Sequence, residues 1–106
     1  MSYRFMRVMV IFDLPVTTAA ARKEYTRFRK YLIKAGFMMM QESVYCKMAP
    51  NATAGDAIVE GVRKHKPSAG LVQVLRVTEK QFSRIECIVG SVEKNVLDSD
   101  ERLVII

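Results

Sequence analysis

The hydrophobic positions of the chain fall into short apolar runs and two stretches with helical spacing. The first run, residues 5–12, is almost continuously apolar and rich in β-forming side chains. Such a run predicts a central strand that is buried on both faces. Asp13-Leu14-Pro15 ends the run, because proline cannot donate to a sheet ladder. Thr17 or Thr18 then offers the N-cap of a helix.

The segment that follows carries an apolar and a basic stripe, both at helical spacing. The apolar stripe predicts the buried face of an amphipathic helix, and its residues are Ala21, Tyr25, Phe28, Leu32 and Ala35. The basic stripe lies on another face of the same helix. It consists of Lys23, Arg27, Lys30 and Lys34, with Arg22 and Arg29 beside it. Gly36 is expected to end the helix at the C′ position.

The second half of the chain predicts further strands and one more helix. Residues 37–48 are expected to be extended, as one strand or as two short strands broken near residues 41–43. A second amphipathic helix is expected from Ala54 to His65. The other expected elements are a strand at 71–77, a turn or single helical turn at 79–84, a strand at 85–89, a polar linker at 91–100 and an apolar end at 103–106.

This order of elements predicts an α+β fold of the ferredoxin-like type, a βαββαβ sandwich over residues 1–90 with extra C-terminal strands. Two helices would cover one face of an antiparallel sheet. No predicted helix is left for the other face, so a second copy of the chain is expected there and the protein is expected to be a homodimer. An isolated apolar strand at the end of the chain would expose unpaired backbone groups and promote aggregation. Residues 91–106 are therefore interpreted as a linker and a docking strand, although docking within the same chain is the alternative.

The positive charge is concentrated in the first part of the chain. Residues 1–40 hold eight Lys and Arg against two Asp and Glu, a difference equal to the net charge of +6, whereas the remaining residues hold nine of each. Such asymmetry favours a polyanionic partner, the alternative being a solvated basic surface. Glu24 is the one carboxylate between residues 16 and 36, so few helical ion pairs can neutralise the stripe.

The basic stripe suits the phosphate backbone of a nucleic acid and implies no readout of base sequence. The predicted nucleic-acid-binding residues are Arg22, Lys23, Arg27, Arg29, Lys30 and Lys34. A second and weaker candidate is the basic run at residues 63–66. His65 within it is interpreted as a structural or surface residue.

Other residue types limit the choice of chemistry and compartment. No apolar run approaches the roughly 20 residues that cross a bilayer, and the first residues lack a signal-peptide layout, so a cytoplasmic protein with no membrane partner is expected. Two cysteines, Cys46 and Cys87, and one histidine cannot form a zinc-ligand set. Both cysteines lie in apolar contexts that favour buried, reduced thiols.

Asp13 is the candidate catalytic and metal-binding residue. A carboxylate at the end of a strand suits Mg²⁺, which prefers oxygen ligands, and the metal would activate water and polarise a phosphate. In the alternative interpretation, Asp13 caps the following turn. General acid–base catalysis needs a second titrating group, and nothing in the sequence places His65 near Asp13.

Several motifs resemble, in their order and spacing, the family of CRISPR-associated protein two, the small subunit of the spacer-acquisition complex. The first is the hydrophobic strand of residues 6–15 that ends in Asp-hydrophobic-Pro, followed by the Arg-Lys and aromatic pattern of residues 22–32. The others are Gly36-Phe37 with residues 41–45, the block at 77–82 and the ending at 101–106. The last two blocks are similar to the version found in systems built around one large guided nuclease.

The resemblance implies a ferredoxin-like homodimer that bridges two dimers of an integrase, CRISPR-associated protein one, and binds duplex protospacer DNA as a mainly non-catalytic scaffold. The C-terminal residues expected to dock on the partner subunit or on the integrase are Leu103, Val104, Ile105 and Ile106. The alternative that the resemblance implies is a Mg²⁺-dependent endonuclease, a phosphodiesterase acting on RNA or DNA. Its metal ion would be shared by the two Asp13 residues of the dimer. A regulatory or RNA-binding ferredoxin-like domain unrelated to CRISPR is the third hypothesis.

Overall fold

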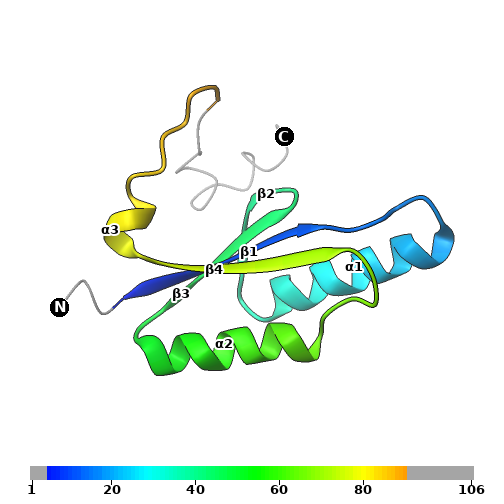
Figure 1. Ribbon diagram of the computed structural model, residues 1–106, viewed down its shortest axis with the longest axis horizontal. Coiled ribbons are helices and arrows are strands. Elements are labelled where there is room, and N and C mark those ends of the chain that lie inside the picture. Colours follow the sequence, from blue (N-terminus) through cyan, green and yellow to red (C-terminus); the bar gives the residue numbers. More distant parts are fainter. Residues whose placement is uncertain (1–4, 91–106) are drawn as a thin grey trace.

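The computed structural model describes residues 5–90, and these form one layer of helices on one four-stranded sheet (Figure 1). The elements are β1 (Met6–Asp13), α1 (Ala19–Lys34), β2 (Met38–Gln41), β3 (Val44–Ala49), α2 (Ala52–Lys64), β4 (Leu71–Thr78) and α3 (Glu79–Phe82). The strands are antiparallel in the order β2-β3-β1-β4. This arrangement confirms the predicted βαββαβ ferredoxin-like core.

Strand β1 shows why the helices cover one face of the sheet. Side chains alternate between the two faces of a strand, and Val8, Val10 and Phe12 point into the core beneath α1 and α2. Met9 lies on the other face and is only 9% exposed, whereas Ile11 is half-buried there. Burial on both faces, as predicted, is therefore found near the middle of β1 and not along its whole length.

The core is organised around aromatic rings from three elements. Phe28 of α1 packs edge to face on Phe12 of β1 with 5.4 Å between ring centroids, and Tyr45 of β3 stacks on Phe12 at 5.7 Å. Phe28 and Leu32 are fully buried. The apolar stripe predicted for α1 is therefore the face that holds this helix to the sheet.

Helix α1 has the predicted signals at both ends. The Thr18 hydroxyl accepts a hydrogen bond from the backbone N–H of Ala21, 3.0 Å away, as an N-cap does. At the other end Gly36 has φ +99°, which a residue with a side chain rarely adopts. The N–H groups of Gly36 and Phe37 donate to the Ile33 and Leu32 carbonyls at 3.0 and 2.9 Å. These bonds form a Schellman motif and confirm Gly36 as the residue that ends the helix.

The structure settles where residues 37–48 break, and it starts α2 two residues earlier than the predicted Ala54. Residues 37–48 form two strands, separated by a turn at Glu42 and Ser43. Helix α2 begins at Ala52, because Asn51 accepts a hydrogen bond from the N–H of Ala54 at 2.8 Å and so acts as its N-cap.

The strand predicted at residues 85–89 is wrong. Thr78 and Gln81 form a capping box that starts α3 at the end of β4, and this turn takes the chain out of the sheet. Ile88 and Val89 are 81% and 92% exposed. Cys87 is exposed too, so the prediction of a buried thiol is wrong for Cys87 and confirmed for Cys46. The predicted linker at 91–100 and the docking strand at 103–106 lie outside the described residues.

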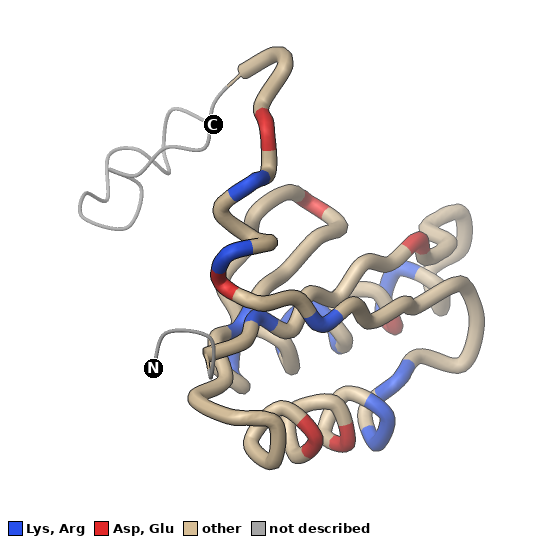
Figure 2. The backbone as a smooth tube through the Cα atoms, turned by 60° about the vertical axis from the view of Figure 1, so that its left-hand side comes forward, with Lys and Arg blue, Asp and Glu red and all other residues tan. Residues whose placement is uncertain are grey.

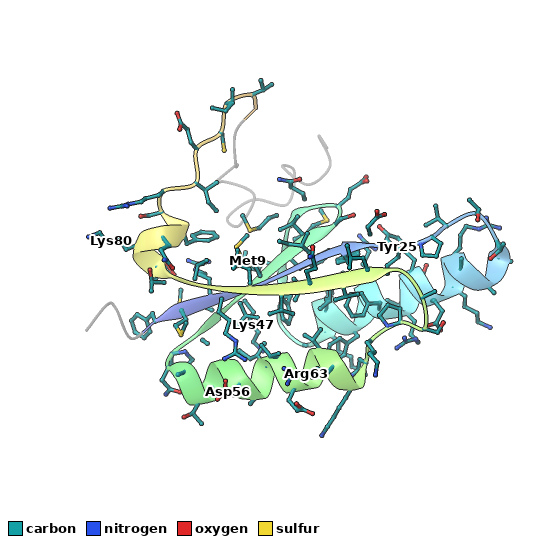
Figure 3. All side chains as sticks on the ribbon, in the orientation of Figure 1. Met9, Tyr25, Lys47, Asp56, Arg63 and Lys80 are labelled. Carbon is teal, nitrogen blue, oxygen red and sulfur yellow. The ribbon has the colours of Figure 1, made fainter. Side chains whose placement is uncertain are left out.

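The face of the sheet away from α1 and α2 is called here the open sheet face. The register of the strands places on it Arg7, Met9, Ile11 and Asp13 of β1, Cys46 and Met48 of β3, Leu71, Gln73, Leu75 and Val77 of β4, and Met38 of β2. Figure 3 shows Met9 and Lys47 on opposite sides of the sheet. Among residues 5–90, no helix is long and apolar enough to cross a membrane.

Candidate nucleic-acid interface

The lysines of the predicted basic stripe lie on the outer side of the helical layer. Because Phe28 and Leu32 face the sheet, the helical repeat puts Lys23, Lys30 and Lys34 on the opposite side of α1, where all three are exposed. Figure 2 shows basic positions along α1 and at the end of α2. We call Lys23, Lys30 and Lys34 the lysine row.

The lysine row is free of internal partners. None of its three ammonium groups makes a hydrogen bond or an ion pair with another residue in the described range. The three residues are seven and four positions apart, which corresponds to about 10 and 6 Å along a helix. The row therefore presents three unpaired positive charges in a line to solvent.

The three arginines that were predicted with these lysines make contacts inside the fold. Arg22 donates from Nη1 to the Val16 carbonyl at 3.1 Å. Arg27 pairs with Glu24 at 3.0 Å and also donates to two carbonyl groups at the end of α2. The predicted set of six cations therefore divides into three exposed lysines and three arginines whose guanidinium groups are already engaged.

Arg29 has the most internal position of the six. Its Nε donates to the hydroxyl of Tyr45 at 2.8 Å, and Tyr45 is fully buried in the core. Burial raises the pKa of Tyr45, while the nearby Arg29 charge opposes that rise. Because a buried hydroxyl without a partner is costly, Arg29 contributes to the fold, and its role in nucleic-acid binding stays a prediction.

Asp13 lies at the end of β1 that is close to the start of β4. It is paired in register with Leu71, is exposed, and lies on the open sheet face. Its carboxylate accepts no hydrogen bond from the described residues, so the alternative in which Asp13 caps the next turn is not observed. No group of three His, Cys, Asp or Glu side chains gathers within residues 5–90. Within these residues, one chain alone therefore does not assemble a three-ligand metal site at Asp13.

The structure also reveals a charged cluster that sequence patterns did not indicate. At the other end of β1, Arg7 forms an ion pair with Glu79 of α3, and its guanidinium lies 4.3 Å from the centre of the Phe82 ring. The bond to Glu79 raises the pKa of Arg7, whereas burial opposes the rise. Arg7 and Glu79 are 72 residues apart, which is why no local pattern predicts the pair. The cluster attaches α3 to the rim of the open sheet face.

Comparison with known proteins identifies the family. The family model described as CRISPR associated protein Cas2 matches residues 6–85, which contain every strand and helix described above. This chain belongs to the Cas2 family. The resemblance inferred from the motifs is therefore confirmed.

Several curated Cas2 proteins are similar to this chain over most of its length. A protein of Treponema denticola is 54% identical over 101 residues, which is 95% of this chain and 100% of that protein. A protein of Ligilactobacillus salivarius is 44% identical with the same coverage, and both are named CRISPR-associated endoribonuclease Cas2. A solved structure titled "Crystal structure of cas2" superposes with a TM-score of 0.57 at 19% identity, covering 85% of this chain and 92% of that one. That similarity supports the Cas2 fold.

Proposed function

We propose that this Cas2-family chain is a DNA-binding scaffold subunit of CRISPR spacer acquisition. As a homodimer it would hold duplex protospacer DNA on the lysine row and bridge dimers of the integrase, CRISPR-associated protein one. The observation that supports this proposal is the exposure of three unpaired lysines in line on α1. A phosphate backbone is the ligand that such a row fits, because each neutralised phosphate releases bound counterions.

The lysine row is tested by replacing Lys23, Lys30 and Lys34 together with alanine. Each subunit that contacts the duplex loses three phosphate contacts, so the slope of log K against log salt concentration is expected to fall by about 2.7 for each contacting subunit. The measurement is fluorescence anisotropy of a labelled duplex of mixed sequence across a series of NaCl concentrations. The three positions are exposed, so circular dichroism should show an unchanged fold.

The control for this test removes exposed cations from another part of the molecule. Lys80 and Arg84 lie in and after α3 and are exposed, and their replacement by alanine should leave the slope within experimental error. A triple lysine variant that binds duplex DNA with the wild-type slope would contradict the proposed interface. So would a wild-type protein whose binding does not depend on salt.

The proposed homodimer forms through the open sheet face. Large apolar side chains on this face are exposed, among them Met38, Met48, Leu71 and Leu75. The charges of Arg7 and Glu79 on its rim neutralise one another, so the unpaired charge that the register places on this face is that of Asp13 at the end of β1. The outer edge of β4 has no partner strand in the described part of the chain, and the same partner would cover it. An apolar face of this kind, with an unpaired edge, suits a second copy of the chain.

A second candidate function is a Mg²⁺-dependent endonuclease that uses Asp13 from both subunits. The names of the curated relatives and the free carboxylate of Asp13 on the proposed dimer face favour it. The donor set fits Mg²⁺, which commonly takes one or two protein carboxylates and keeps several waters. When bound, the ion would supply a polarising charge for a phosphate oxygen and an activated water, and Asp13 would hold it.

Asp13→Ala separates the two candidate functions. If the second candidate is right, Mg²⁺-dependent cleavage of labelled RNA or DNA should fall by at least about 100-fold, since metal assistance provides several kcal/mol. The salt-dependent binding of duplex DNA and spacer acquisition in cells should both persist if the scaffold is the main function. Asp56→Ala, which removes an exposed carboxylate from α2, is the matched control. Cleavage that is equal in the Asp13→Ala variant and the wild type would exclude Asp13 as the metal-binding residue.

A further inference from the structure

Four sulfur-containing side chains gather near the middle of the open sheet face. Met38 of β2 is paired in register with Cys46 of β3, and Cys46 is paired with Met9 of β1. Residues that are paired in this way across neighbouring strands have Cβ atoms about 4.5–5.5 Å apart on the same face. Met48 lies two residues along β3 from Cys46 and shares this face. We call Met38, Cys46 and Met9 the sulfur row.

The thiol at the centre of the sulfur row is covered by neighbouring side chains. Cys46 is 3% exposed and Met9 is 9% exposed, although α1 and α2 lie on the other side of the sheet, whereas Met38 is 45% exposed. A methionine side chain has three rotatable bonds, so both thioethers can turn toward the sulfur of Cys46 between them. The exposure of Met38 leaves the β2 end of the row accessible from solvent.

The donor atoms of the sulfur row determine which metal ion they fit. Thiolate and thioether sulfurs select soft ions such as Cu(I), whereas Mg²⁺ takes oxygen ligands. One thiolate and two neutral thioethers give a monovalent ion a complex with no net charge. A divalent ion such as Zn²⁺ would leave a charge of +1 among apolar side chains, which is costly. The row therefore fits a monovalent soft ion.

The surroundings of the sulfur row favour an uncharged complex. Leu75 of β4 is paired with Met9 and continues the row with an apolar side chain. Arg7, two residues before Met9 on β1, is neutralised by Glu79. Asp13 lies four residues after Met9, which corresponds to about 13 Å along a strand. The candidate Mg²⁺ site at Asp13 and the sulfur row are therefore separate.

We propose that Cys46, Met9 and Met38 form a binding site for a monovalent soft metal ion of the Cu(I) type. The ion bonds to the sulfur of Cys46, and the thiol proton goes to solvent. Met9 and Met38 each donate a lone pair from the thioether sulfur, and no atom changes its oxidation state. All three donors belong to one chain, so the site depends neither on the proposed binding of DNA nor on the proposed dimer. In a dimer through this face, an uncharged complex can stay enclosed between the two subunits.

The sulfur row is tested by competition for Cu(I) against the chelator bicinchoninate, with the full-length protein under reducing, oxygen-free conditions. Every sample carries Cys87→Ala, because the exposed thiol of Cys87 would bind the same ion. This parent chain is expected to bind one Cu(I). Met9→Leu/Met38→Leu keeps apolar side chains of similar volume and removes two sulfur donors. Its affinity should fall at least about 100-fold, since even partners outside the ligand shell are worth about 10–100-fold.

Met39→Leu is the matched control, because Met39 lies on the same strand as Met38, is also 45% exposed and points to the other face of the sheet. This variant should bind Cu(I) as the parent does, and Cys46→Ala should not bind it. Circular dichroism checks that each variant folds, and the double methionine variant decides the test if Cys46→Ala does not.

Three outcomes would overturn the inference. A parent chain that takes up no Cu(I) in the competition has no such site. Parent affinity in Met9→Leu/Met38→Leu means that a single thiol holds the ion without the thioethers. An equal loss of affinity in Met39→Leu means that the effect does not depend on the face of the sheet.

Discussion

Replacing Phe28 with alanine is expected to lower the free energy of unfolding by about 3–5 kcal/mol, since the change removes a buried aromatic ring and leaves a cavity. Phe28 is fully buried and packs edge to face on Phe12. It is also the side chain through which the middle of α1 contacts the sheet. Urea unfolding followed by circular dichroism at 222 nm (the usual helix signal) measures the change.

The same helix provides the control for this prediction. Ile33 is an apolar residue of α1 that is 51% exposed, and Ile33→Ala should change the free energy of unfolding by no more than about 0.5 kcal/mol, as is usual for surface positions. Equal losses in the two variants would mean that the helix is not held to the sheet by the face containing Phe28. They would also remove the reason for placing the lysine row on the outside.

Replacing Leu75 with glutamate is expected to convert the proposed dimer into a monomer. Leu75 lies on the open sheet face opposite Met9 and is 50% exposed in the single chain, so the fold can tolerate a charge there. In the dimer two carboxylates would be buried without partners, and an unpaired buried charge costs several kcal/mol. Size-exclusion chromatography with light scattering should show the wild type at twice the mass of the variant.

Ile33→Glu introduces the same charge at an isoleucine of α1 that is equally exposed, but on the helical side of the molecule. This variant should remain a dimer. If the wild type itself is a monomer at micromolar concentration, the open sheet face is not a dimer interface. If Ile33→Glu dissociates and Leu75→Glu does not, the subunits associate through the helical layer, and the proposed DNA-binding surface would then be covered.

Local patterns in the sequence were sufficient to predict most of the fold. The continuous apolar run of β1, the stripe that contains Phe28 and Leu32, and Gly36 at the end of α1 each depend on residues within one element or its cap. The structure confirms all three. The βαββαβ order followed from these elements together with the expected turns, because few topologies accommodate that order.

The errors arose where an element depends on distant residues. Residues 85–89 have the composition of a strand, but a strand exists only when another strand pairs with it, and within the described residues none does. The predicted cation set stays a prediction, but its division into lysines and arginines also depends on distant residues. The spacing along α1 places Arg27 and Arg29 near the lysines, but the spacing contains no information on the α2 carbonyls or the Tyr45 hydroxyl that these arginines contact. The docking strand at 103–106 remains a prediction.

The arginines of α1 contact other parts of the fold, whereas its lysines point to solvent. The outward charge of this helix can therefore be changed by chemistry that is specific for lysine. Acetylation cancels the positive charge of a lysine and does not affect an arginine. Mild treatment with an acylating reagent would therefore remove the outward charge of Lys23, Lys30 and Lys34 stepwise, while the guanidinium contacts to Tyr45 and to the end of α2 stay intact. An acetyltransferase acting on the same amines would neutralise the same charges. The affinity for a polyanion would then fall while the subunit stays folded.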